Sequence, residues 1–240
     1  MQAHRVFDRF QRVMPRRVSR VLRSLGTAFL TPFYFARTTG HFRSSLVGKA
    51  LNASGAPIPW YTYPAIELLR NKSFRGRRVL EFGAGQSTLW WSQRAEHVTS
   101  FEADPEWYKY VLPQLPQNTL LHLVDDQLSG FEHLVPSSER FDVIVIDGLG
   151  RLTAATKSRH LLAPGGVFLL DNSEGYWGPE GTYPIVDLFR ECGYARVDFY
   201  GFSPGNSLQH CTSLFFRDSC FLFQGEDHPV SLGTLERYQA

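Results

Sequence analysis

The stretch Val79-Leu80-Glu81-Phe82-Gly83-Ala84-Gly85-Gln86-Ser87-Thr88 decides the fold of this 240-residue chain. An apolar run typical of a buried strand leads into a turn with two glycines, and Ser87 and Thr88 suit the first turn of a helix. Gly83 and Gly85 let the backbone turn tightly and approach a ligand with no Cβ atom in the way. The N–H groups that open the helix would then point at that ligand. The stretch therefore predicts a strand, a ligand-binding turn and a helix.

Four further apolar runs follow this stretch and alternate with longer amphipathic segments. Each run is nearly all apolar, as expected for strands buried on both faces of a parallel sheet. Polar residues follow each run and collect at the carboxyl ends of the strands, where open α/β sheets bind their ligands. The predicted strands are Val79–Phe82, Val98–Phe101, Leu120–Val124, Val143–Ile146 and Val167–Leu170.

The C-terminal part of the chain has a different pattern. A helix is predicted over about Tyr183–Cys192 and ends at Gly193, a residue type favoured just after a helix. Two strands follow, Val197–Phe202 and Thr212–Phe216, joined by the nine residues Ser203–Cys211. A helical crossover needs about a dozen residues or more, so this pair is predicted to be an antiparallel hairpin. We therefore predict a doubly wound, mostly parallel, seven-stranded α/β sheet (Rossmann-like) that ends in an antiparallel hairpin.

The N-terminal part of the chain is distinguished by its charge. Residues 1–70 are predicted to be a basic, mainly helical extension, and residues 71–240 the ligand-binding domain. Residues 1–50 hold ten Lys or Arg and one acid, whereas the other 190 residues hold fifteen bases and twenty-two acids. Such a basic segment can contact an anionic membrane surface, nucleic acid or the protein's own acidic surface, or pack on the core as an amphipathic helix. Beyond residue 50 no basic stripe with interleaved aromatics occurs, so no nucleic-acid partner is expected.

The overall composition is that of a globular protein, with 43% apolar and 20% charged residues. The three cysteines show no metal-ligand spacing, and an odd, sparse set suits a reducing compartment. No apolar run reaches the roughly 18 residues that a membrane span needs. We therefore predict a cytoplasmic protein, with the last fifteen residues weakly specified.

The acids around the glycine turn indicate which ligand the turn binds. Glu102 follows the second predicted strand, nineteen residues after Gly83, where a carboxylate can accept both ribose hydroxyls of a nucleoside. The dinucleotide fingerprint needs a third glycine where Thr88 stands, and Glu81 would be unfavourable beside a pyrophosphate. A carboxylate at position 81 suits a ligand that carries an ammonium group, such as the methionine part of S-adenosylmethionine. An NAD-dependent oxidoreductase is an alternative on the same scaffold.

Several segments resemble the cofactor motifs of the class I S-adenosylmethionine-dependent methyltransferases. They are Glu81–Gly85 with Glu102, Phe141–Gly148 and Leu161–Gly166. The terminal hairpin also suits that fold, and the resemblance covers about residues 75–218.

The resemblance implies a role for each of these acids. Glu81 would bind the methionine amino group, directly or through water, and Glu102 would hold the ribose hydroxyls above the glycine turn. Asp125 or Asp126, after the third strand, would lie near the adenine edge. The residues that the resemblance places at the cofactor are Glu81, Gly83, Ala84, Gly85, Gln86, Ser87, Glu102, Asp125, Asp126 and Asp147.

A second group of polar residues follows the fourth and fifth strands. Asp147 and the pair Asp171-Asn172 should lie close together there, and their oxygens suit Mg²⁺ or Ca²⁺. This also resembles the metal-dependent catechol and caffeoyl-coenzyme A O-methyltransferases, in which an Asp and then Asp-Asn hold the ion. Those enzymes have a Lys where this chain has Gly150, and the guanidinium of Arg151 stays protonated and cannot be a base. The alternative to a metal is that these acids bind loop backbone or substrate directly.

The predicted activity is methylation, with O-methylation of a small hydroxylated molecule favoured. Asp147 is the residue expected nearest the chemistry, and His210, in the hairpin loop, is a candidate catalytic base. The segment Pro59–Pro64 is either an entrance that folds over the cofactor or ordinary aromatic core. Sugar, lipid-linked and protein acceptors stay open. So does a non-catalytic module of the same fold, attached to a membrane or a partner through residues 1–50.

Overall fold

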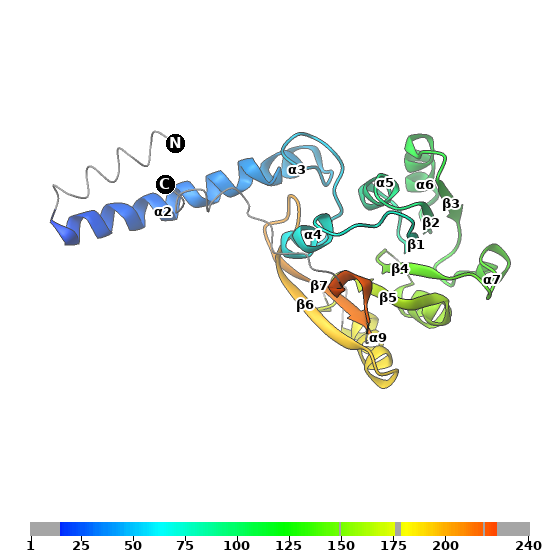
Figure 1. The fold of residues 1–240 in the computed structure, drawn as a ribbon. Coiled ribbons are helices and arrows are strands. Elements are labelled where there is room, and N and C mark those ends of the chain that lie inside the picture. Colours follow the sequence, from blue (N-terminus) through cyan, green and yellow to red (C-terminus); the bar gives the residue numbers. More distant parts are fainter. Residues whose placement is uncertain (1–14, 149, 176–178, 218, 225–240) are drawn as a thin grey trace.

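A seven-stranded sheet forms the centre of the molecule in the computed structural model, which describes residues 15–148, 150–175, 179–217 and 219–224 (Figure 1). The strand order is β3-β2-β1-β4-β5-β7-β6, and β7 runs antiparallel to both of its neighbours. The remaining neighbours pair in parallel. The strands are β1 (Arg78–Phe82), β2 (His97–Glu102), β3 (Thr119–Leu123), β4 (Phe141–Ile146), β5 (Leu162–Leu170), β6 (Ala195–Phe202) and β7 (Gln209–Phe216).

This architecture confirms the predicted doubly wound sheet and its terminal antiparallel hairpin. The expectation that every strand is buried on both faces is wrong for β3, which exposes 61% of Leu120 and 47% of Leu123. The reason is position, because β3 is an edge strand and the helices that cover the two faces pack mainly on the central strands. The strand order reverses between β1 and β4, and open sheets bind ligands at such a switch point.

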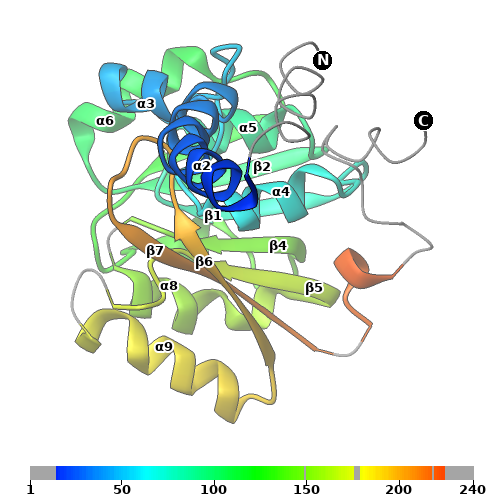
Figure 2. The same ribbon diagram turned by 90° about the vertical axis from the view of Figure 1, so that its left-hand side faces the viewer.

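Helices cover both faces of the sheet (Figure 2). On one face, α4 and α5 pack on Val79, Val98 and Val143, and α6 covers the β3 edge. On the other face, α7, α8 and α9 pack on residues of opposite register, such as Leu80 and Ile144. The helices are α4 (Tyr63–Arg70), α5 (Gln86–Ser92), α6 (Pro105–Val111), α7 (Phe131–Leu134), α8 (Arg151–Ser158) and α9 (Pro179–Glu191).

The N-terminal part is helical, as predicted, and consists of α2 (Arg16–Thr38), α3 (His41–Val47) and a loop that leads to α4. The alternative in which its amphipathic helix packs on the core is wrong, because α2 buries none of its residues. Within the described part of the helix, Phe35, near its end, packs against the core. No helix within the described ranges is long and apolar enough to cross a bilayer. Residues 1–14 of the extension and the last fifteen residues lie outside the described residues.

Candidate active site at the carboxyl edge of the sheet

The glycine turn after β1 is shaped by the neighbouring strand end. Gly83 has a φ of +97°, and a Cβ atom added there would lie 2.9 Å from the carbonyl of Asp147. Gly148, with a φ of +73°, faces the same contact from the other side. Only glycines allow the ends of β1 and β4 to approach so closely. Gly85 is extended and meets no such obstacle, so an added Cβ would make only ordinary contact with Trp107, at 3.7 Å.

Glu81 is fully buried directly below this turn. Its Oε2 accepts hydrogen bonds from the hydroxyls of Thr88 and Ser100, each at 2.6 Å. The strand register places Ser100 beside Glu81, and the opening of α5 supplies Thr88. Its other oxygen, Oε1, is buried and finds no hydrogen-bond partner among the described residues. Burial raises the pKa of Glu81 to about 7, against the opposing effect of the hydroxyls of Ser100, Thr88 and Ser87.

Glu102 lies at the end of β2 and holds the turn from the other side. Its Oε2 accepts from the backbone N–H of Ala84 at 3.0 Å, and its Oε1 from those of Ala103 and Asp104, each at 2.8 Å. A carboxylate has about four acceptor positions, so it can accept further bonds from a ligand. Trp107, in the first turn of α6, donates its indole N–H to the carbonyl of Ala84 at 2.6 Å. The turn is therefore fixed by a carboxylate and an indole ring.

Two adjoining hollows open at this edge of the sheet. The first, of about 230 Å³, is lined by the glycine turn, Glu102 and Trp107. The second, of about 670 Å³, is lined by the residues after β4 and β5 and by the β6–β7 loop. Trp60, Asp147 and Gly148 line both. We refer to them as the turn hollow and the loop hollow.

Arg151 occupies the centre of the group that was predicted to bind a metal. Its Nη2 donates to Asp147 Oδ1 at 3.0 Å and to Asn172 Oδ1 at 3.2 Å. Its Nε donates to the carbonyl of Gly148 at 3.0 Å, and its Nη1 to the backbone carbonyl of Asp171. The guanidinium thus already places a positive charge among these oxygens, and a second cation there would be repelled.

The predicted Mg²⁺ or Ca²⁺ site at Asp147, Asp171 and Asn172 is therefore not supported. The Asp171 carboxylate is engaged elsewhere, because its Oδ1 accepts the hydroxyl of Thr212 at 2.6 Å. Burial and the nearby charge of Asp147 raise the pKa of Asp171 to about 8. No cluster of three or more His, Cys, Asp or Glu that could hold a metal occurs within the described part of the chain.

His210 lines the loop hollow from the start of β7 and is 5% exposed. Its Nδ1 lies 3.5 Å from Glu174 Oε1 and 3.4 Å from Asn172 Nδ2. The other oxygen of Glu174 accepts the backbone N–H of Cys211 at 2.8 Å, which fixes this carboxylate beside the imidazole. Glu174 and Asn172 therefore flank the imidazole at the wall of the loop hollow.

Asp125 and Asp126, which follow β3, make no hydrogen bond to the glycine turn among the residues that the structure describes, whereas Glu102 of β2 does. Asp125 accepts the backbone N–H groups of Gln127 and Ser129 at 3.1 and 2.8 Å, which closes its own exposed turn. The bonds from Ser129 lower the pKa of Asp125. Neither Asp125 nor Asp126 is among the residues that line the turn hollow, and an adenine-binding role for either stays a prediction.

The aromatic segment Pro59–Pro64 was interpreted either as an entrance over the cofactor or as core, and its residues have both placements. Trp60 is 41% exposed, lines both hollows and donates its indole N–H to the carbonyl of Pro204 at 3.0 Å. Tyr61 and Tyr63 belong to the core, where Tyr61 accepts the indole N–H of Trp91 at 3.1 Å. One residue of the segment therefore lies at the site, and the others anchor it.

Comparison with known proteins identifies the fold. No protein-family model matches the chain, and no curated protein is significantly similar to it in sequence. Among solved structures, the precorrin-6y C5,15-methyltransferase of Geobacter metallireducens aligns at 14% identity over 64% of this chain and 86% of its own, with a TM-score of 0.51. A candidate methyltransferase of Streptococcus mutans in complex with SAH aligns at 14% identity over 66% and 99%, with a TM-score of 0.50. A candidate caffeoyl-CoA O-methyltransferase of Staphylococcus aureus aligns at 14% identity over 80% and 98%, with a TM-score of 0.51.

The fold is that of the class I S-adenosylmethionine-dependent methyltransferases. Within this methyltransferase fold, the structure brings together Glu81, Glu102 and Asp147 around the glycine turn, as their places at the strand ends suggested. The sequence did not point to Arg151, Trp107 or Glu174. The signal for Trp107 was an aromatic residue in the first turn of the helix after Glu102, where it faces the glycine turn. No local pattern marks Glu174, because its partners belong to β7. Arg151 lies four residues after Asp147, but its bonds to Asp171 and Asn172 depend on the tertiary structure.

Proposed function

We propose that the protein is a methyltransferase that binds S-adenosylmethionine in the turn hollow and a methyl acceptor in the loop hollow. The observation that carries the proposal is Glu81 Oε1, a buried oxygen beneath the glycine turn with no partner within the described structure. An ammonium group, reaching it directly or through water, would supply the missing hydrogen bond. Glu102 Oε2 accepts one backbone N–H and keeps an acceptor position for a ribose hydroxyl beside the same turn. When bound, S-adenosylmethionine supplies an electrophilic methyl group.

The chain's own residues would position the acceptor against that methyl group. Asp147 lies where the two hollows join, and its Oδ1 is held by the N–H of Gly148 at 2.8 Å and by Arg151. His210 would take the proton of an acceptor hydroxyl, and Glu174 would stabilise the resulting imidazolium. In-line displacement depends mainly on alignment in a hollow that excludes water. We favour a small hydroxylated acceptor, whose oxygen needs such a base.

Affinity for S-adenosylmethionine is expected to rise with pH as Glu81 ionises. With a pKa of about 7 in the free protein, Glu81 is mostly protonated at lower pH and must lose its proton to pair with the ammonium group. The affinity should therefore fall about eightfold between roughly pH 7.5 and pH 6. Calorimetric titration at the two pH values measures this directly.

Glu81→Gln and the ligand 5′-methylthioadenosine provide the controls for that titration. The variant should bind S-adenosylmethionine more weakly at the higher pH and lose the pH dependence, since a glutamine does not titrate there. The nucleoside lacks the amino acid part, so its affinity should depend neither on pH nor on the variant. Failure of the folded protein to bind S-adenosylmethionine, or binding of NAD instead, contradicts the methyltransferase proposal.

His210→Asn is expected to slow transfer to a hydroxylated acceptor by about 10²–10⁴-fold and to leave S-adenosylmethionine affinity unchanged. The reason is that His210 lines only the loop hollow. Transfer of a labelled methyl group to a panel of catechols, phenols and sugars identifies the acceptor and measures the rate. His160→Asn, an exposed histidine of the segment after α8, is the matched control and should keep the full rate. Equal rates for His210→Asn and the wild type would show that His210 is not the catalytic base.

A further inference from the structure

Helix α2 projects from the body of the molecule (Figure 1). One side of it is an exposed apolar stripe. Apolar side chains recur along one side of this 23-residue helix at spacings of three and four residues. This pattern is typical of a helix whose apolar side is covered by another apolar surface. Phe29 is nevertheless 75% exposed and Phe33 66%. The exposed members of the stripe are Val18, Val21, Leu22, Leu25, Phe29 and Phe33.

The opposite side of α2 is basic and hydroxylated. At 100° per residue, Arg16, Arg20 and Arg23 lie on that side with Thr27 and Thr31. The helix contains no acid, and none occurs in the sequence between Asp8 and Glu67. Arginines opposite an uncovered apolar stripe match a surface that offers both anionic groups and hydrocarbon.

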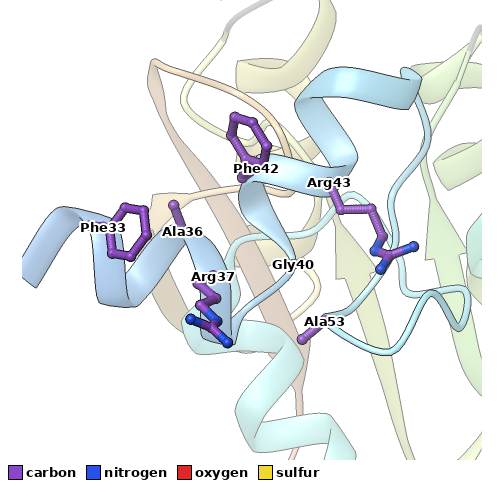
Figure 3. A pocket seen from close by; sticks show the side chains of 7 residues that line it. All are labelled: Phe33, Ala36, Arg37, Gly40, Phe42, Arg43 and Ala53. Carbon is purple, nitrogen blue, oxygen red and sulfur yellow. The ribbon is translucent and has the colours of Figure 1, made fainter.

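The apolar surface continues onto α3. Phe42 and Leu46 are 67% and 76% exposed, and Phe42 follows closely on the end of α2. A hollow of about 570 Å³ lies where the two helices meet. Figure 3 shows Phe33 and Phe42 at this hollow, with the guanidinium groups of Arg37 and Arg43 beside them. Two apolar rings and two guanidinium groups thus line one hollow that the two helices share.

We propose that α2 and α3 dock on the surface of an anionic lipid bilayer. The stripe of α2 would lie in the interface toward the acyl chains, and the arginines would contact headgroup phosphates. Pairing of this face with a second copy is disfavoured, because it would bury Arg37 and Arg43, which line the same hollow as Phe33 and Phe42, with no acid on α2 or α3 to compensate. The proposal does not rest on methyl transfer.

Co-sedimentation of the full chain with vesicles tests the docking. The protein should bind phosphatidylcholine vesicles that contain about 30% phosphatidylglycerol, but not pure phosphatidylcholine, and salt should weaken the binding. Leu25→Ser with Phe29→Ser should reduce the partition coefficient at least about tenfold, because both side chains leave the apolar stripe. The matched control is Leu30→Ser with Tyr34→Ser. These residues are similarly exposed, at 67% and 65%, but lie off the stripe, so binding should stay within about twofold of wild type.

Three results would overturn the proposal. The first is a wild-type protein that ignores anionic vesicles, and the second is an equal loss of binding in both double variants. The third is a lipid-independent dimer that Leu25→Ser with Phe29→Ser converts to a monomer, which would make the stripe an interface between copies. Neither pair removes a buried side chain, so thermal unfolding of the body should be unchanged and misfolding can be excluded as the cause.

Discussion

Arg151→Met is expected to lower the free energy of unfolding by about 3 kcal/mol. It should also lower the rate of methyl transfer roughly 100-fold. The side chain is 8% exposed and donates hydrogen bonds to groups that follow both β4 and β5. Its removal leaves the Asp147 carboxylate, 26% exposed, without its ion-pair partner. Loss of one partner of a buried pair costs about 3–5 kcal/mol, and the partial exposure of Asp147 places the effect at the lower end. The loss of transfer follows because Asp147 lines both hollows and would no longer be held in place.

Urea unfolding and methyl-transfer rates measure the two effects of this variant. Arg159→Met is the matched control, because Arg159 is exposed at the end of the same helix, and it should change stability by less than about 0.5 kcal/mol. Adding Asp147→Asn to Arg151→Met should recover part of the stability, since no unpaired charge then remains, but it should not recover transfer. An unchanged urea midpoint for Arg151→Met would show that the ion pair contributes nothing to folding.

Glu102→Ala should weaken binding of S-adenosylmethionine by on the order of 100-fold. A hydrogen bond from a ribose hydroxyl to an ionised acceptor would be lost, worth about 1.5–3 kcal/mol in a favourable geometry. The N–H groups of Ala84, Ala103 and Asp104 would also lose their acceptor, so the turn would be less well fixed. Both effects weaken the binding of S-adenosylmethionine.

Comparing ligands separates the role of Glu102 from that of Glu81. Glu102→Ala should weaken both S-adenosylmethionine and 5′-methylthioadenosine, because both contain the ribose, whereas Glu81→Gln should weaken only the former. Glu106→Ala removes a carboxylate that is 84% exposed on the adjacent helix and should leave both affinities unchanged. If Glu102→Ala binds 5′-methylthioadenosine as tightly as the wild type, the ribose does not lie at Glu102.

Local sequence patterns were sufficient to predict most of the fold. The apolar runs, the glycine turn and the short connection between the last two strands are properties of neighbouring residues, and the structure confirms all seven strands and the hairpin. The carboxyl-edge positions of Glu81, Glu102 and Asp147 follow in the same way, since each directly precedes the turn or ends a strand. Even so, the pattern predicted two-sided burial for β3, because an apolar run does not say whether helices cover both faces of a strand or whether it lies at the edge of the sheet.

The sequence by itself therefore determined the class I methyltransferase-type sheet and the acids at its edge. Only the tertiary structure decided that a guanidinium, rather than a metal, links Asp147 and Asn172, because Arg151 meets oxygens that are up to 21 residues away in the chain. The same holds for α2. An amphipathic period is identical for a helix that packs on a core and for one that faces outward, and what lies against the apolar side depends on contacts that no local pattern contains.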